Sequence, residues 1–155
     1  MRILLSVITL VIGLAFCQSV ALADMPDPKG KSENANIVAA RKAIDAKDFK
    51  SAVGYLTKAV QEEPKNADAH SMLGYSYRKV GTLDKSMEHY QTALKIEPSH
   101  RSAQEYLGEL YLDMNQPENA EKQLATLKKA CPMFGKCEEF EDLKKAIDDY
   151  KTKKK

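Results

Sequence analysis

Tryptophan is absent from this 155-residue sequence, and aromatic residues make up only 7% of it. Runs in which β-branched or aromatic residues alternate with polar ones are also missing, which argues against a β-sandwich or a barrel. Charge of neither sign is in excess, because 24 lysines and arginines face 22 aspartates and glutamates. The net charge therefore gives no indication of nucleic-acid binding. With 30% charged residues, the composition favours an all-helical, solvent-rich fold.

Signatures of the common catalytic and cofactor sites are missing as well. There is no Cys-x-x-Cys-His for covalent haem, no Walker loop, no Gly-x-Ser-x-Gly and no His-Glu-x-x-His. His70, His89 and His100 are scattered over different predicted helices, and we interpret them as surface or packing residues. A copper site of the His–Met or Cys–His type is a conceivable alternative, but no ligand pair has helical metal spacing. The sequence predicts no catalysis, no metal and no cofactor.

The first 23 residues have the features of a secretion signal. Arg2 gives a positive start, residues 3–16 are mostly apolar, and residues 21–23 (Ala-Leu-Ala) supply the small-x-small pattern that signal peptidase requires. Cleavage after Ala23 is expected, and an uncleaved anchor is the alternative because the apolar run nearly spans a bilayer. Lipoprotein processing at Cys17 is disfavoured by the bulky residue before it. Each alternative predicts a periplasmic or secreted protein, with no membrane contact beyond such an anchor.

Two cysteines, Cys131 and Cys137, would remain in a mature chain of about 130 residues, enough for one domain. In an oxidising compartment, two nearby cysteines are most simply a disulfide. A thiol-redox or metal-handling role is the alternative, because Cys137 stands where a helix N-terminus would activate a thiol. Five residues separate the pair, unlike the Cys-x-x-Cys of dithiol oxidoreductases. This spacing favours a structural bridge.

An internal period of 34 residues decides the fold. It separates Pro64, Pro98 and Pro132. The same 34-residue step superimposes Leu73 on Leu107, Gly74 on Gly108 and Tyr77 on Tyr111. Three further positions are occupied in all three periods: Ala52, Ser86 and Ala120; Leu56, Tyr90 and Leu124; and Ala59, Ala93 and Leu127. Ala39, Ala40 and Ala43 stand 34 residues before Leu73, Gly74 and Tyr77. The period therefore runs three times and is weakest at its start.

Each period is predicted to contain two helices. In the middle one, Leu73, Tyr77 and Val80 share a face of a first helix over residues 67–79. The second helix has an inner stripe of Met87, Tyr90, Ala93 and Leu94. Breaks are expected at Gly81-Thr82 and Glu97-Pro98-Ser99. Glycine costs about 1 kcal/mol in a helix, so we expect Gly74 and Gly108 to let the two helices of a pair approach closely.

These residues make the sequence similar to the tetratricopeptide repeat family, which has a Leu-Gly pair, a tyrosine three residues later and a proline closing each 34-residue unit. The resemblance implies a right-handed superhelix of antiparallel helix pairs, an all-α solenoid whose inner groove binds partner segments. The predicted organisation is a signal peptide (1–23), a linker (24–32), three repeats (33–66, 67–100 and 101–134), a capping helix (135–151) and a basic tail (152–155).

The segment after the third repeat has an apolar stripe at helical spacing, made of Phe140, Leu143, Ile147 and Tyr150. Acidic residues crowd its start and lysines its end, which complements a helix dipole. A stack of helix pairs leaves its last apolar face open, so a terminal helix with a polar outer side is required. This segment resembles the first helix of a truncated fourth repeat. Together with the cysteines it also resembles the C-terminus of small exported bacterial tetratricopeptide proteins.

The family resemblance implies that outward-facing residues of each first helix line the groove. These are Ile37, Val38, Arg41 and Asp45, then Met72, Tyr75, Arg78 and Lys79, then Glu105, Tyr106, Glu109 and Asp113. We expect a basic patch (Arg41, Arg78, Lys79) beside an acidic one (Glu105, Glu109, Asp113), with Tyr75 and Tyr106 as anchors. The family's carboxylate clamp for chaperone tails needs lysine and asparagine, and Ile37, Arg41 and Met72 stand there instead.

The sequence thus predicts a non-catalytic adaptor or scaffold that binds a segment of another protein, whose identity it does not give, in the concave groove. A thiol-redox or metal-handling factor using Cys131 and Cys137 is the alternative from another class. Self-assembly through the weak first repeat, which would expose small residues, is a third. The oligomeric state stays open.

Overall fold

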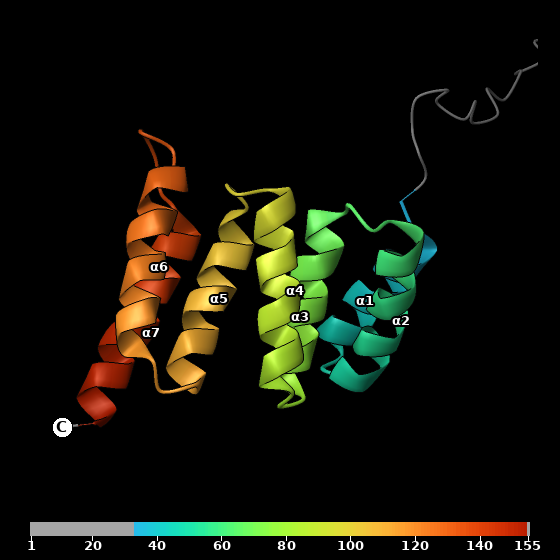
Figure 1. The fold of residues 1–155 in the computed structure, drawn as a ribbon, viewed down its shortest axis with the longest axis horizontal. Helices are drawn as coiled ribbons and strands as arrows, with labels where there is room; N and C mark the ends of the chain where they lie inside the picture. The colour runs from blue at the N-terminus through green and yellow to red at the C-terminus, as the bar shows by residue number, and fades with distance from the viewer. Residues whose placement is uncertain (1–32, 155) are drawn as a thin grey trace, which may run out of the picture. The chain divides into compact units, whose positions relative to one another are not determined.

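Seven helices make up the regular secondary structure of residues 33–154, which are the residues that the computed structural model describes. They are α1 (Ala35–Asp45), α2 (Phe49–Glu62), α3 (Ala67–Lys79), α4 (Leu83–Ile96), α5 (Arg101–Asp113), α6 (Pro117–Ala130) and α7 (Glu138–Lys153). Figure 1 shows them as an upright stack in sequence order, from α1 and α2 at one end to α6 and α7 at the other. The predicted all-α solenoid of helix pairs is confirmed.

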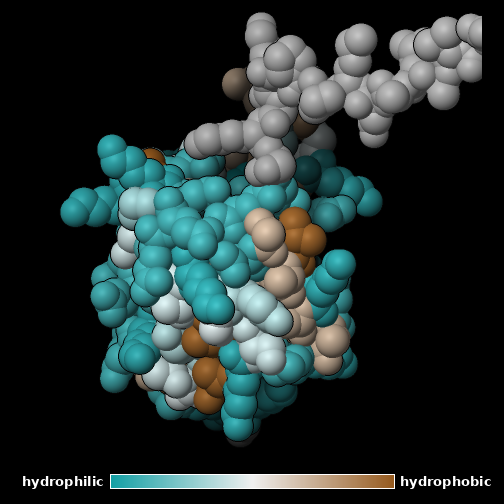
Figure 2. Space-filling model, turned by 90° about the vertical axis from the view of Figure 1, so that its right-hand side faces the viewer, coloured by the Kyte–Doolittle hydropathy of each residue, from teal (hydrophilic) through white to brown (hydrophobic). Residues whose placement is uncertain are grey.

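Two helices lie within each predicted repeat, and α5 packs on α3 and α7 as well as on its neighbours α4 and α6. None of the described helices is long and apolar enough to cross a membrane. The predicted signal peptide (1–23) and linker (24–32) lie outside the described residues. Figure 2 looks onto the α1–α2 end of the stack, whose surface is mainly hydrophilic with hydrophobic residues in small patches. A polar outer face is what the terminal unit of a repeat stack requires.

The turn inside each helix pair repeats one backbone conformation. Lys47, Gly81 and Asn115 have φ values of 59°, 83° and 57° and follow one another at the 34-residue period. The next residue's amide donates to the carbonyl five residues earlier, as from Thr82 to Tyr77 at 2.9 Å. This is a Schellman ending, which satisfies free carbonyl groups of the first helix. Lysine adopts the left-handed region less readily than glycine or asparagine does, so the first unit again fits the pattern least well.

A polar side chain from each following unit fastens the turn between units. The Nε2 atom of His70 lies 3.2 Å from the carbonyl oxygen of Pro64, and Gln104 Nε2 donates to the carbonyl oxygen of Pro98 at 2.6 Å. His70 and Gln104 occupy the same position of the 34-residue period. Pro64 and Pro98 therefore lie at successive, equivalent junctions of the stack.

Within the pairs, a small residue on the first helix faces a large one on the second. Tyr90 on α4 is fully buried, and a Cβ added to Gly74 on α3 would come within 2.7 Å of its Cδ1 atom. The first unit holds Ala40 and Leu56 at the same two positions, and both are fully buried. The close approach predicted for Gly74 is therefore present. The second unit fills this space with glycine and tyrosine, and the first unit fills it with alanine and leucine.

Gly108 serves a different contact from the one predicted. A Cβ there would come within 2.5 Å of Leu143 Cδ2, so the residue makes room for α7 and not for the second helix of its own pair. Val80 was predicted to share a helix face with Leu73 and Tyr77, which the structure does not show. Helix α3 ends at Lys79, and Val80, as its C-cap, is exposed.

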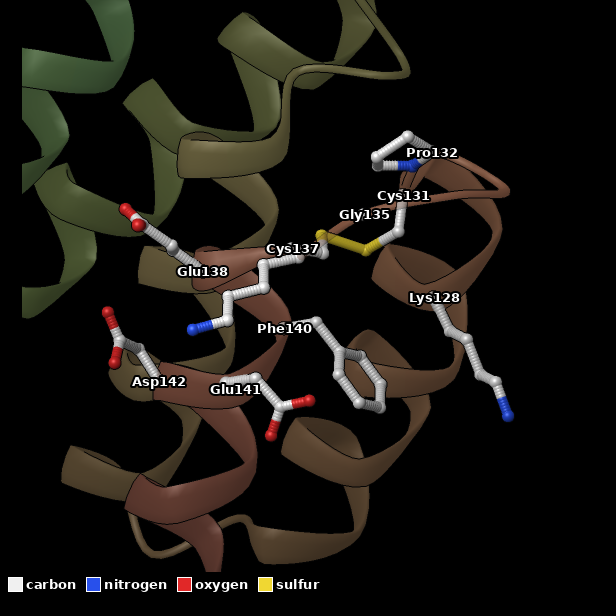
Figure 3. A pocket seen from close by; sticks show the side chains of 10 residues that line it. Lys128, Cys131, Pro132, Gly135, Cys137, Glu138, Phe140, Glu141 and Asp142 are labelled. Carbon is white, nitrogen blue, oxygen red and sulfur yellow. A yellow bond between two sulfur atoms is a disulfide. The ribbon is translucent and has the colours of Figure 1, made fainter.

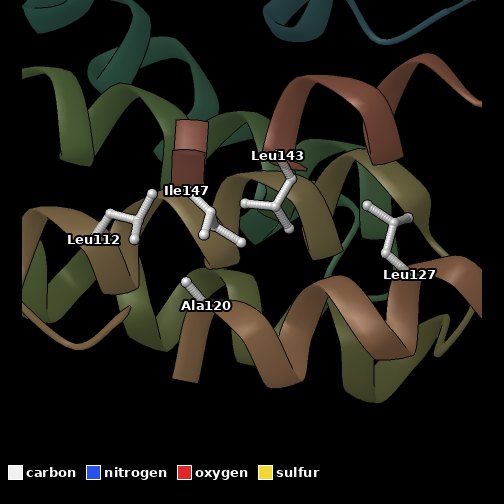
Figure 4. Close-up of a cluster of buried hydrophobic side chains, with 5 residues drawn as sticks. All are labelled: Leu112, Ala120, Leu127, Leu143 and Ile147. Carbon is white, nitrogen blue, oxygen red and sulfur yellow. The ribbon is translucent and has the colours of Figure 1, made fainter. Parts of the chain in front are cut away.

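Helix α7 closes the apolar end of the stack. Figure 4 shows Leu143 and Ile147 projecting from α7 toward Leu112, Ala120 and Leu127 of α5 and α6, and these five side chains form one buried cluster. Phe140 and Tyr150 pack against the cluster from its edge. The whole predicted apolar stripe of the capping helix therefore faces the third repeat.

The capping helix begins and ends later than the predicted range of 135–151. It starts at Glu138, after the turn that contains the cysteines, and it runs to Lys153, so part of the predicted tail is helical. Lys151 Nζ pairs with a carboxylate oxygen of Glu121 at 2.7 Å, and lysines in the last turn complement the negative end of the helix dipole. These contacts extend the helix into the basic segment.

We expect Gly74→Ala to lower the free energy of unfolding by about 2 kcal/mol, because the added Cβ would overlap the ring of Tyr90. Combining it with Tyr90→Leu recreates the pair found in the first unit and should recover part of the loss. Urea unfolding followed by circular dichroism measures both effects. As a control, Gly54→Ala on α2 meets nothing within 4 Å and should stabilise by up to about 1 kcal/mol. A double variant less stable than Gly74→Ala would contradict this account of the packing.

Candidate functional site

A pocket of about 270 Å³ opens on the face formed by the first helices of the three units. Its lining comprises Arg41, Ile44 and Asp45 from α1, Met72 and Tyr75 from α3, and Tyr106 from α5. Four of these were predicted from the sequence as groove-lining residues: Arg41, Met72, Tyr75 and Tyr106. Asp45 was expected beside them, and Ile44 was missed because it follows the apolar pattern of the helix. We call this hollow the aromatic pocket.

The aromatic pocket is built around two tyrosine rings held by their neighbours. The ring centroids of Tyr75 and Tyr106 are 5.1 Å apart, and Phe49 meets Tyr75 edge to face at 5.9 Å. Lys79 Nζ lies 5.1 Å from the centroid of Tyr75, a cation–π contact. Burial raises the pKa of Tyr75, and it raises the pKa of Tyr106 to about 12. Both hydroxyl groups are therefore neutral and available as hydrogen-bond donors.

Arg78 does not belong to the predicted basic patch. Its side chain is mostly buried, and its guanidinium binds the carboxylates of both Glu109 and Asp113. Arg78 thus pairs with two of the predicted acidic residues across α3 and α5, so the predicted basic and acidic residues do not form two separate patches. Arg41 is exposed and pairs with Glu33, which leaves Lys79 as the exposed cation beside the aromatic pocket.

A second pocket of about 280 Å³ lies on the other side of this ion pair. We call it the polar pocket; its lining comprises Arg78, Glu109, Leu112 and Asp113 from α3 and α5, and Ala146, Asp149, Tyr150 and Lys153 from α7. The α7 residues were not predicted as part of any site, because the segment was interpreted as a cap. Its resemblance to the first helix of a fourth repeat was the signal that could have placed it along the groove.

Glu105 was expected on an exposed acidic patch, but its side chain is only 8% exposed. Burial raises its pKa to about 8, and the neighbouring carboxylates of Glu109, Asp142 and Glu139 act in the same direction, whereas Arg78 opposes them. Glu105 is therefore largely protonated at neutral pH. It contributes to the packing of α5 on α7 and adds little negative charge to the groove.

Ile37 is the other predicted groove residue that the structure places elsewhere. It is buried in a cluster with Ala59 and Ala69, between α1 and the next helices. Val38, beside it, is half-buried and lines neither pocket. The shorter α1, which begins two residues later in its period than α3 and α5 do, supplies only Arg41, Ile44 and Asp45 to the groove.

Two of the histidines interpreted as scattered are in fact in contact. His70 Nδ1 and His89 Nδ1 are 3.1 Å apart, and the ring of His89 stacks on Tyr77 with centroids 5.6 Å apart. Since His70 Nε2 faces the carbonyl oxygen of Pro64, we assign His70 Nδ1 as the acceptor and His89 Nδ1 as the donor. Burial lowers the pKa of His89. The contact joins α3 to α4, and no group of three candidate metal ligands occurs among residues 33–154.

Cys131 and Cys137 are joined by a disulfide, with their Cα atoms 5.7 Å apart. The bridge spans the turn between α6 and α7. It connects the C-cap of α6 to the N-cap of α7. It lies in neither the aromatic nor the polar pocket.

The model of the tetratricopeptide repeat matches this sequence at residues 37–101 and again at 72–132. The chain belongs to the tetratricopeptide repeat family. Among solved structures, it is similar to the TPR2B domain in a complex of yeast Sti1 with pHsp70, with a TM-score of 0.70 at 11% identity over 76% of this chain and 94% of that one. The tetratricopeptide domain of Sgt2 from Aspergillus fumigatus gives a TM-score of 0.66 at 21% identity, over 76% of each chain.

The chaperone SycD of the Yersinia enterocolitica type III secretion translocator is similar too, with a TM-score of 0.68 at 13% identity, over 77% of this chain and 83% of that one. At these identities the likeness concerns the fold alone. Among curated proteins, the RNA polymerase-associated protein CTR9 of Caenorhabditis elegans is 30% identical over 95 residues, which are 61% of this chain and 8% of that protein. The chain spans less than a tenth of the length of such relatives.

The buried carboxyl group of Glu105 predicts a pH-dependent stability. Between pH 4.5 and about 8 the folded protein holds a proton that the unfolded chain releases, so stability should fall as the pH rises through this window. We expect Glu105→Gln to raise the free energy of unfolding by about 1–3 kcal/mol at pH 8 and to have little effect near pH 4.5. Denaturant unfolding at a series of pH values measures this difference.

The matched control is Glu109→Gln, four residues along the same helix. It removes a carboxylate that Arg78 binds, so it should not stabilise the protein at pH 8. If both variants raised the free energy of unfolding at pH 8 by the same amount, the cause would be the general reduction of negative charge and not the burial of Glu105.

Proposed function

We propose that this protein is an exported, non-catalytic adaptor that binds an extended segment of another protein along the face formed by its first helices. The observation that carries the proposal is the aromatic pocket, in which residues from all three units converge on two tyrosine rings. Aromatic residues that combine a large contact area with a hydroxyl group are frequent energetic anchors of interfaces. Solved tetratricopeptide domains of RPAP3 are bound to peptides of HSP70 and HSP90, which supports a peptide-binding role by analogy.

The two pockets define the segment that would fit. The aromatic pocket offers apolar walls from Ile44 and Met72 and suits one apolar or aromatic side chain. The polar pocket begins one helical turn further along α3, at Arg78, and suits a short polar stretch. Because Arg78 offsets part of the negative charge of Glu109 and Asp113, we expect recognition to depend on the apolar anchor more than on net charge.

Chaperone tails are poor candidates for the ligand. The RPAP3 structures contain the peptides SGPTIEEVD and SRMEEVD, which carry acidic residues at their ends. The family resemblance implies that lysine and asparagine side chains would hold such ends. At the corresponding positions here, Ile37 is buried, Met72 lines the aromatic pocket and Arg41 pairs with Glu33. We therefore infer a partner of different chemistry, with an apolar anchor in place of a terminal carboxylate cluster.

An extracytoplasmic location is part of the same proposal. The signal-like residues 1–23 and the bridge between Cys131 and Cys137 both suit an oxidising compartment. We assign the bridge a structural role, since it ties the capping helix to the third repeat. The thiol-redox and metal-handling alternative would require the same two sulfur atoms to be free.

The groove is tested with peptides selected from a random display library on the purified protein. We expect the selected peptides to share an apolar or aromatic residue, and we expect Tyr75→Ala combined with Tyr106→Ala to weaken their binding at least about tenfold. Fluorescence anisotropy measures the dissociation constants. The matched control is Tyr55→Ala, because Tyr55 is a partly exposed tyrosine on α2 and lies outside both pockets.

The peptide SRMEEVD serves as a second probe, and we expect no saturable binding of it. Selected peptides whose affinity is unaffected by the loss of both tyrosines would rule out the aromatic pocket as their site. Tight binding of SRMEEVD would instead overturn the inferred partner chemistry while leaving the groove in place.

The structural role of the bridge makes a separate prediction. We expect mass spectrometry after alkylation under non-reducing conditions to find neither Cys131 nor Cys137 modified. We also expect the bridge to stay oxidised in buffers poised near about −250 mV, because structural disulfides have lower potentials than this. A bridge half-reduced in the range of catalytic dithiols, about −120 to −270 mV, would support the redox alternative.

A further inference from the structure

The turn between α6 and α7 carries the most exposed hydrophobic side chains of the described chain. Met133 is 90% exposed and Phe134 is 87% exposed, whereas the next large hydrophobic residue, Tyr55, is 39% exposed. Single exposed apolar residues are ordinary, but two adjacent ones at the tip of a turn form a continuous apolar surface. We call this pair the loop tip.

The loop tip is kept outside the core by the way the turn is closed. The disulfide between Cys131 and Cys137 joins its two ends, and Gly135 takes a φ of 108° within it. A ring this short cannot fold back to cover its own side chains, so Met133 and Phe134 stay in water unless another molecule covers them. The bridge also means that little conformational entropy remains to be lost when the tip binds.

A hollow of about 760 Å³ lies directly beside the loop tip. The disulfide and Pro132 form one wall, and Phe140 of α7 lines it from the other side. Figure 3 shows the ring of Phe140 between α6 and α7, with the carboxylate of Glu141 beside it. A projecting apolar tip and a hollow with an aromatic wall thus occur at the same end of one molecule.

The charges around the hollow are of both signs. Lys128 and Lys136 line it together with Glu138, Glu141 and Asp142. An anionic lipid surface would be repelled by these three carboxylates, and the site lacks the basic rim that membrane-inserting tips use. A second copy of the same end, related by a two-fold axis, would instead bring each copy's lysines to the other's carboxylates.

We propose that the loop tip of one molecule docks into the hollow of a second copy, forming a two-fold dimer through the C-terminal ends of two stacks. In this dimer Met133 and Phe134 lie against the partner copy's aromatic wall, and Lys136 faces the carboxylate of Glu141 across the axis. A large side chain such as phenylalanine buries about 150–250 Å². Two tips and the surfaces they cover therefore give an interface of roughly 1,000–1,500 Å², between the small interfaces of transient complexes and the standard interfaces of stable ones.

The experiment is sedimentation equilibrium of the protein expressed as the full chain and purified as the host processes it, from about 5 to about 500 µM. We expect a reversible monomer–dimer equilibrium with a dissociation constant of roughly 10–100 µM. Phe134→Ser should weaken it at least about tenfold, whereas the matched control Tyr55→Ser on α2 should leave it unchanged.

A charge exchange makes the test specific to the two-fold arrangement. The dimer of the Lys136→Glu variant and the dimer of the Glu141→Lys variant should each dissociate, since like charges would then face each other. An equimolar mixture of the two variants should dimerise, because both contacts are of opposite charge in the mixed pair. A protein that is monomeric throughout, or a mixture that fails to recover the dimer, overturns the proposal. Phe134-dependent cosedimentation of a monomeric protein with phosphatidylglycerol vesicles would assign the tip to lipid and overturn it as well.

Discussion

No helix pair among residues 33–154 can bury its own apolar face, so every unit must be covered by the next helix or helix pair. The repeated left-handed turn at Lys47, Gly81 and Asn115 sets the angle within each pair, and the side chains of His70 and Gln104 fasten one unit to the previous one. With both joints fixed, the first helices of successive units line one face of the stack. The third unit is covered by α7, through Leu143 and Ile147.

The architecture was predictable because it follows from the spacing of a few residue types along the sequence. A 34-residue stride of prolines, glycines and apolar residues specifies where helices end and which faces meet. The errors arose where neighbours decide the outcome. Gly108 faces α7 because Leu143 reaches it, and no pattern within the third unit reveals that. Ile37 occupies a groove position by phase, but α1 begins late and the side chain packs on Ala59 and Ala69 instead. Val80 lies just past the end of its helix.

The residues of the aromatic pocket were largely predictable, whereas those that α7 adds to the polar pocket and the electrostatics of both pockets were not. Four groove residues (Arg41, Met72, Tyr75 and Tyr106) converge on the aromatic pocket. The charge of the same face could not be inferred from the sequence, because it depends on which side chains approach across helices. Arg78 reaches Glu109 and Asp113 from the neighbouring unit, and burial leaves Glu105 protonated. The contact of His70 with His89 joins residues on separate helices whose spacing carries no motif.

The ion pairs from Arg78 to Glu109 and Asp113 span the boundary between the second and third units. Because the Arg78 side chain is mostly buried, dissolved salt would screen these pairs only weakly. The aromatic pocket takes residues from α1, α3 and α5, and the polar pocket takes residues from α3, α5 and α7. A ligand that occupies both pockets would therefore contact all three units and the capping helix, and its length would have to match the spacing of those helices.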